Sequence, residues 1–179
     1  MAKYISTKTY GNEIGLSCCF RQWRSTHSHC SLLHGYSIGV HVEFESETLD
    51  DRNWVMDFGG LKAFKSWLEY TFDHTLVVAQ DDPYLDIFKG MAVYGLQDQG
   101  GMCDLRVVEG VGCEKFAELA FNTLDEIIKT YQSGKSWHLK NDKGGTLQTF
   151  ECRYPVGQGV RLRSVKVFEH GANAAVYEA

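Results

Sequence analysis

The chain has 179 residues, enough for one compact domain with a sizeable core and marginal for two. Its apolar content of 44% and charged content of 23% are those of an ordinary soluble globular protein, and a formal net charge of -5 without any basic run speaks against a general nucleic-acid binder. No apolar run reaches membrane-spanning length, and the first residues form no signal-peptide pattern. The six cysteines have no paired spacing, so we expect free thiols and a reducing, cytoplasmic location.

The first third of the chain predicts two strands. Residues 3–23 form a strand region broken by two glycines, and a polar, histidine-rich loop follows over 25–30. From Tyr36 to Phe44 apolar and polar residues alternate, which is typical of a strand with one buried face, and the two strands should pair antiparallel. The same alternation places His34 on the buried face, where an imidazole needs a hydrogen bond, a metal or a substrate as its partner.

The middle of the chain predicts two main helices. Asp57 is a good N-cap, and apolar residues recur at helical spacing from Leu61 to Phe72. The longest apolar stripe runs from Phe116 to Tyr131. Between the two helices we expect a short helix over 84–91. That stretch also has β-prone pieces at 75–79 and 105–108, and a glycine-rich loop at 95–104.

The last third predicts a hairpin turn or flexible excursion at 143–145, followed by strands at 160–169 and 174–177. The order of the main elements is therefore two strands, two helices and two strands (ββααββ). This order predicts an α+β domain in which the helices lie on one face of a four-stranded antiparallel sheet.

A cysteine, a histidine four residues later and a glycine at the mouth of a strand suggest a reactive corner around Cys30. This corner is one of six landmarks that, taken in order, resemble the 6-pyruvoyl- and 6-carboxy-tetrahydropterin synthase family. The landmarks are Phe20-Arg21, Cys30-Ser31-Leu32-Leu33-His34-Gly35-Tyr36, Met56-Asp57-Phe58, Asp73-His74, Gly112-Cys113-Glu114 and Lys166-Val167-Phe168-Glu169.

The resemblance covers nearly the whole chain and implies one domain over 1–179, with extra material near 80–104 and 133–158. It also implies the tunnelling fold, in which the four-stranded sheets of several subunits close into a barrel. A homo-oligomer, with a hexamer as the expected size, follows from that fold. Val111-Gly112-Cys113 replaces the family's Pro-Thr-Ser type of helix start, so a hydroxyl contact made there is lost.

The activity implied by the resemblance is that of a lyase of the 6-carboxy-tetrahydropterin synthase type, acting on 7,8-dihydroneopterin triphosphate in pterin or queuosine-precursor synthesis. Cys30 matches the cysteine that abstracts a proton, and Asp73 with His74 matches the pair that activates it and can belong to a neighbouring subunit. Glu169 matches the carboxylate that anchors the pterin ring. Glu114 is either a charge at a helix start or a second pterin contact.

The cofactor implied by the resemblance is zinc held by three histidines, one ending the first strand and two in a His-Gly-His corner. Only His34 matches, because Phe20 and Tyr36 occupy the other two positions. His29 together with Cys18 or Cys30 could complete an altered site around His34.

Two classes of function therefore stay open. The lost histidines favour a metal-free relative that binds a pterin or purine-like ring without this catalysis. The retained cysteine, Asp-His pair and glutamate favour the enzyme, whose product could also be that of a 6-pyruvoyl-tetrahydropterin synthase.

Overall fold

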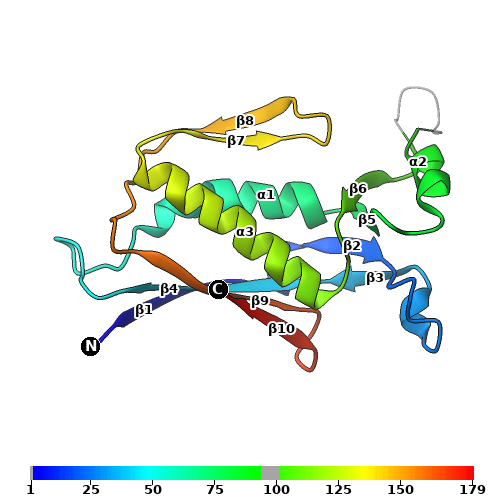
Figure 1. Cartoon of the computed structure of the whole chain (residues 1–179), viewed down its shortest axis with the longest axis horizontal. Helices are drawn as coiled ribbons and strands as arrows, with labels where there is room; N and C mark the ends of the chain where they lie inside the picture. Colours follow the sequence, from blue (N-terminus) through cyan, green and yellow to red (C-terminus); the bar gives the residue numbers. More distant parts are fainter. Residues whose placement is uncertain (1, 94–100) are drawn as a thin grey trace.

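A four-stranded antiparallel sheet with the order β1-β4-β9-β10 forms the base of the molecule (Figure 1). The computed structural model describes residues 2–93 and 101–179, which include all four strands. The antiparallel pairing of the first strands with each other, and of the last two strands, is confirmed. The strands are β1 (Tyr4–Tyr10), β4 (Gly39–Ser46), β9 (Arg161–Phe168) and β10 (Ala174–Glu178).

One face of this sheet is apolar because β4 alternates as its sequence predicts. Ile38, Val40, Val42 and Phe44 have no exposed surface, and they belong to the main core cluster. Helices α1 (Lys62–Phe72) and α3 (Cys113–Gln132) cover this face, with α3 packed directly on β9 and β10 (Figure 1). The α+β architecture predicted from the sequence is confirmed.

The predicted N-cap at Asp57 is confirmed in a modified form. Its side chain accepts a hydrogen bond from the Gly59 amide at 2.8 Å, and this bond starts the 3-10 turn η3 (Phe58–Leu61) that leads into α1. The cap thus begins a tighter turn rather than the α-helix itself.

A second sheet with the order β3-β2-β5-β6 extends the fold at one end (Figure 1). Strand β5 runs parallel to both β2 and β6, whereas β3 is antiparallel to β2. The strand predicted over Tyr36–Phe44 is interrupted at Ile38, whose amide donates to the Leu16 carbonyl at 3.0 Å. The chain passes there from one sheet to the other. The strands are β2 (Ser17–Phe20), β3 (His34–Ser37), β5 (Thr75–Ala79) and β6 (Asp104–Val108).

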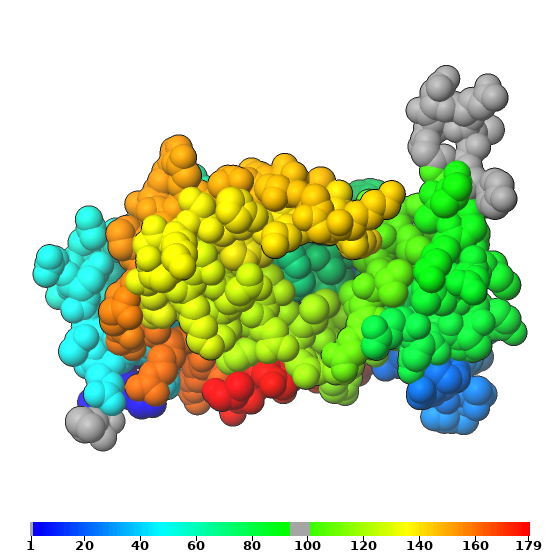
Figure 2. All heavy atoms as spheres, turned by 45° about the horizontal axis from the view of Figure 1, so that its top comes forward, coloured from blue at the N-terminus to red at the C-terminus, as the bar shows by residue number. Residues whose placement is uncertain are grey.

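Two further elements lie outside these sheets. The hairpin of β7 (Trp137–Lys140) and β8 (Thr146–Phe150) packs over α1 and α3 on the side away from the main sheet. The short helix α2 (Leu85–Val93) lies at the far end of the second sheet, beside the histidine-rich loop, as Figure 2 shows in green and blue. The hairpin agrees with the turn predicted at 143–145 as one of two alternatives, and α2 agrees with the short helix predicted over 84–91. Most of the predicted glycine-rich loop 95–104 lies outside the described residues. None of the described helices has the length and apolarity needed to cross a bilayer.

Candidate functional site

Four elements meet at one end of the core and bring Cys18, Tyr36, Cys113 and Glu169 together. Cys18 of β2 is the cross-strand partner of Tyr36 of β3. Cys113 is the first residue of α3, and Glu169 directly follows β9. The carboxylate of Glu169 lies close enough to influence the pKa of each of the other three groups. The site is therefore assembled from segments that are far apart in the chain.

Glu169 is held in this place by its backbone. Its carbonyl accepts a hydrogen bond from the Asn12 side-chain amide at 3.4 Å, and the same amide donates to the Ser37 carbonyl at 2.5 Å. The preceding residue, Phe168, lies opposite Gly39, and its ring occupies the space that a Cβ at Gly39 would fill. Phe168 thus lies across β4, and Glu169 is fixed beside the end of β3.

The surroundings of Glu169 disfavour additional negative charge. Burial raises the pKa of the Cys113 thiol to about 12, and the Glu169 carboxylate contributes to this rise. Burial likewise raises the pKa of Tyr36 and of Cys18 to about 12. All three groups are therefore protonated at neutral pH. Within the described part of the chain, no lysine, arginine or histidine forms an ion pair with Glu169.

An aromatic stack occupies the three positions that the sequence analysis associated with zinc. The rings of Phe20 and Tyr36 lie 3.9 Å apart with an angle of 15° between their planes, and the His34 ring lies 4.4 Å from Tyr36. Phe116 of α3 packs edge-on against Phe20 at 5.0 Å. Phe20 is 1% exposed, so the stack runs from the core to the surface.

The prediction that His34 is buried is wrong. His34 lies on the expected side of β3, but the cover supplied by Phe116 reaches only Phe20, and the imidazole is exposed. Its Nδ1 and the Leu32 carbonyl oxygen are hydrogen-bonded at 2.8 Å. Nδ1 is the donor, because a carbonyl can only accept. The other ring nitrogen, Nε2, lies on the side of the ring away from this bond.

These residues do not fit a zinc ion. Phe20 offers no donor atom, and the raised pKa values of Tyr36 and Cys18 keep both protonated, whereas metal ligands must be deprotonated. No group of three histidine, cysteine, aspartate or glutamate side chains in residues 2–93 and 101–179 could hold a metal. The altered site predicted around His34 with His29 is therefore not assembled.

Cys30 lies at the edge of this stack. It is the middle residue of the 3-10 turn η2 (His29–Ser31), where its amide donates to the Ser28 hydroxyl at 3.1 Å. Its carbonyl accepts from the Gln22 amide at 2.7 Å, which fixes the turn to the end of β2. Cys30 is half-buried and close enough to Tyr36 to influence its pKa. The thiol thus lies at the border of this group of side chains.

The predicted partners of Cys30 lie elsewhere in the same chain. Asp73 and His74 form a hydrogen-bonded pair, Oδ1 to Nδ1, at 2.5 Å at the end of α1. The His74 amide donates to Ser17, at the start of β2, whereas Cys30 is bonded to Gln22, beyond its end. Five extended residues span roughly 16 Å. Within one chain the pair and the thiol thus lie beside opposite ends of β2, so the predicted activation would use the pair of a neighbouring subunit.

The start of α3 lies against Gln22, a residue for which the sequence predicts no role. Gly112 has φ of 112°, and a Cβ there would lie 2.5 Å from the Gln22 Nε2 atom. Glycine at this position thus lets the side-chain amide of Gln22 approach the first turn of the helix. Glu114 lies exposed in that turn, as expected of a charge at a helix start. The only signal for Gln22 was its place directly after Phe20-Arg21.

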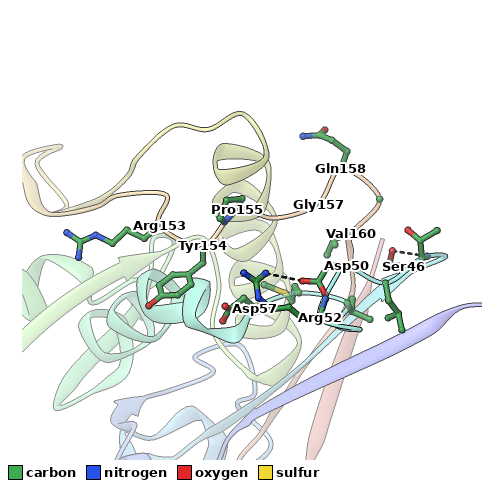
Figure 3. Close-up of a pocket in the computed structure, with 15 residues that line it drawn as sticks. Ser46, Asp50, Arg52, Asp57, Arg153, Tyr154, Pro155, Gly157, Gln158 and Val160 are labelled. Atoms are coloured by element: carbon green, nitrogen blue, oxygen red, sulfur yellow. Dashed lines mark hydrogen bonds and ion pairs between the residues drawn. The ribbon is translucent and has the colours of Figure 1, made fainter.

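A separate cavity of about 430 Å³ lies at the opposite end of the main sheet (Figure 3). Its charged side chains are paired locally: Arg52 lies 3.7 Å from Asp50, and Arg153 lies 3.1 Å from Glu151. Of the landmark residues, it contains only Asp57 and its neighbour Met56. We therefore place the candidate site at the aromatic stack and Glu169. The cavity is formed by the loop 46–57 and the segment 153–160.

Comparisons with known proteins point to one family and one fold. A family model described as 6-pyruvoyl tetrahydropterin synthase matches residues 11–141. The 6-carboxy-5,6,7,8-tetrahydropterin synthases of Rickettsia felis and Rickettsia bellii are each 30% identical to this chain over 74 residues, which are 38% of this chain and 54% of theirs. The aligned part thus spans about half the length of these curated relatives.

Solved structures resemble the whole chain. An uncharacterized protein from Wolinella succinogenes has a TM-score of 0.69 at 18% identity and covers 99% of both chains. The 6-pyruvoyl tetrahydropterin synthase of Plasmodium vivax has a TM-score of 0.61 at 12% identity and covers 98% of both. At these identities the likeness shows a shared fold, the tunnelling fold expected from the sequence.

Proposed function

Since the chain belongs to the 6-pyruvoyl tetrahydropterin synthase family, we propose that it binds a pterin-type bicyclic ring at Glu169, beside Tyr36 and Cys113. The observation that carries this proposal is the Glu169 carboxylate, which has no cationic partner among the described residues and lies beside three protonated groups. Such a carboxylate is stabilised by a ligand that donates two hydrogen bonds, as the amino and N–H edge of a pterin does. Tyr36 and His34 offer aromatic ring faces next to it.

The Glu169→Gln variant tests this proposal. Glutamine replaces one acceptor oxygen by an amide that faces the donors of the ring, so we expect pterin affinity to fall about 30- to 150-fold, or about 2–3 kcal/mol. The measurement is calorimetric titration with 7,8-dihydroneopterin. Glu126→Gln, at an exposed position on α3, is the matched control and should bind as the wild type does. Equal affinity of all three proteins would remove Glu169 from the site.

A second candidate function is the lyase reaction of a 6-carboxy-tetrahydropterin synthase. It is favoured by the half-buried Cys30 thiol at the edge of the site, by the hydrogen-bonded Asp73 and His74, and by the names of the curated relatives. In this reaction Cys30 would take the proton and His74 of a second copy would activate it. Product from 7,8-dihydroneopterin triphosphate, lost in Cys30→Ala with pterin binding retained, would establish this activity. Binding without turnover in the wild type would leave the ring-binding function.

The edges of the main sheet support a homo-oligomer, which we propose to be a hexamer in the cytoplasm. In the described chain β1 and β10 each pair on one side only, and unpaired edges of this kind are normally covered. The six cysteines are free, which suits a reducing compartment. Light scattering at micromolar concentration should give a mass several times that of one chain, 20.3 kDa. A monomer would contradict the assembly and, with it, a shared Cys30–His74 site.

A further inference from the structure

We propose that Phe20, Tyr36 and His34 form an aromatic platform that takes the place of the metal, so that this chain binds its ligand by ring contacts and without zinc. The part that concerns zinc stands on the site geometry alone. The part that concerns the ligand rests on the proposed pterin binding.

The platform is built by the pairing of two strands. Phe20 of β2 lies directly opposite His34 of β3, and Tyr36 is the next residue on the same side of β3. Directly opposite Cβ atoms in such a pair are about 5 Å apart, which is also a suitable spacing for two ligands of one metal ion. The backbone register would thus allow histidines at these three positions to face one another. Because two of the positions are Phe20 and Tyr36, the side chains form an aromatic stack instead.

The stack is packed as a unit rather than left as an empty site. Phe20 is sandwiched between Tyr36, at 3.9 Å, and the edge of Phe116, at 5.0 Å. A zinc ion held jointly at the three positions would need donor atoms where the Phe20 and Tyr36 rings lie against each other. The exposed face of His34 and the half-buried Tyr36 are instead suited to a flat heteroaromatic ligand, because offset ring stacking is favourable at such distances.

This arrangement predicts which part of a ligand is recognised. A metal would bind the hydroxyl groups of a ligand side chain, whereas the platform and Glu169 contact the ring alone. We therefore expect pterins with and without a dihydroxypropyl side chain to bind with affinities within about threefold of each other. A loss of more than about tenfold on removal of the side chain would overturn the ring-only recognition.

The zinc content of the protein is the direct test. Wild-type protein purified without an affinity tag and dialysed against zinc should contain less than about 0.1 zinc ion per chain by mass spectrometry of the metal. The variant Phe20→His/Tyr36→His restores three imidazoles and should bind about one zinc ion per chain. That zinc should be lost again when His34→Ala is added. One zinc per wild-type chain, removed by His34→Ala, would overturn the proposal.

A second variant covers the case in which the double variant fails to fold, because Phe20 is buried. Tyr36→His changes only the half-buried position and creates a pair of histidines on one strand face. It should compete with a chromophoric chelator for zinc more strongly than the wild type. No gain in either folded variant would contradict the inference that these positions keep the geometry of a metal site. Because these measurements require no pterin, they are independent of the test of the proposed function.

Discussion

Replacing Asp82 by alanine is expected to lower the free energy of unfolding by about 3–5 kcal/mol, because it leaves a largely buried arginine without its partner. Arg21 donates from Nε and from the second guanidinium nitrogen to both oxygens of Asp82, at 2.9 and 2.7 Å. The side chains of Arg21 and Asp82 are 15% and 1% exposed. Although burial opposes it, the guanidinium and the Tyr84 amide hold the pKa of Asp82 below its ordinary value.

The neighbouring residue provides a matched control. Asp81 also pairs with an arginine, Arg24, at 2.7 Å, but these two side chains are 48% and 64% exposed. Asp81→Ala should therefore cost about 1 kcal/mol or less. Urea unfolding followed by tryptophan fluorescence measures both. Equal effects of the two variants would contradict the assignment of the Arg21–Asp82 pair as a main support of this region.

The same ion pair connects the segment before α2 to the loop that carries Cys30. Asp82 lies shortly before α2, and Arg21 precedes Gln22, whose backbone amide donates to the Cys30 carbonyl. Asp82→Ala should therefore also increase hydrogen exchange in the loop 21–31, while the exchange of the hairpin β7–β8 stays unchanged. The ion pair thus gives this segment a structural role that its sequence does not indicate.

Replacing Phe116 by alanine is expected to destabilise the protein by about 3–5 kcal/mol and to weaken pterin binding as well. Phe116 has no exposed surface, and its ring contacts Phe20 and Phe72, each at a centroid distance of 5.0 Å. The cavity left by alanine would lie directly beneath the aromatic stack. Without this support, the Phe20 and Tyr36 rings can no longer be held in a single arrangement.

The Phe121→Ala variant distinguishes a general loss of stability from a specific loss of pterin binding. Phe121 is 6% exposed and lies on the same helix, but it packs against Tyr177 of β10, away from the stack. We expect a comparable loss of unfolding free energy and an unchanged pterin affinity at a temperature where both variants are folded. Equal weakening of binding by both variants would show that the stack does not depend on Phe116.

Several local features could be predicted from the sequence because they depend on residues close together in the chain. The Asp57 cap depends on residues two positions apart, and the Asp73–His74 pair on adjacent ones. The alternation in β4 predicted its buried face because side chains of a strand point to opposite sides. The order of the six landmarks indicated the family, which the match over residues 11–141 supports.

Other features depended on contacts between residues far apart in the sequence, which no local sequence pattern indicates. The exposure of His34 depends on which side chains pack against β3, and the separation of Cys30 from His74 follows from the parallel pairing of β2 with β5. The support given by Asp82 to the Cys30 loop joins residues 61 positions apart.

The sequence by itself determined the α+β architecture, the family and the identity of the groups available for chemistry. Hydrophobic periodicity and residue type can be read directly from the linear sequence. Only the tertiary structure decided what those groups do together. The substitutions Phe20 and Tyr36 can be seen in the sequence as lost metal ligands, but their stacking with His34 requires β2 and β3 to be paired in a defined register. Pairing energies between distant side chains exist only once the strands have met, which is why this part of the site could not be predicted in advance.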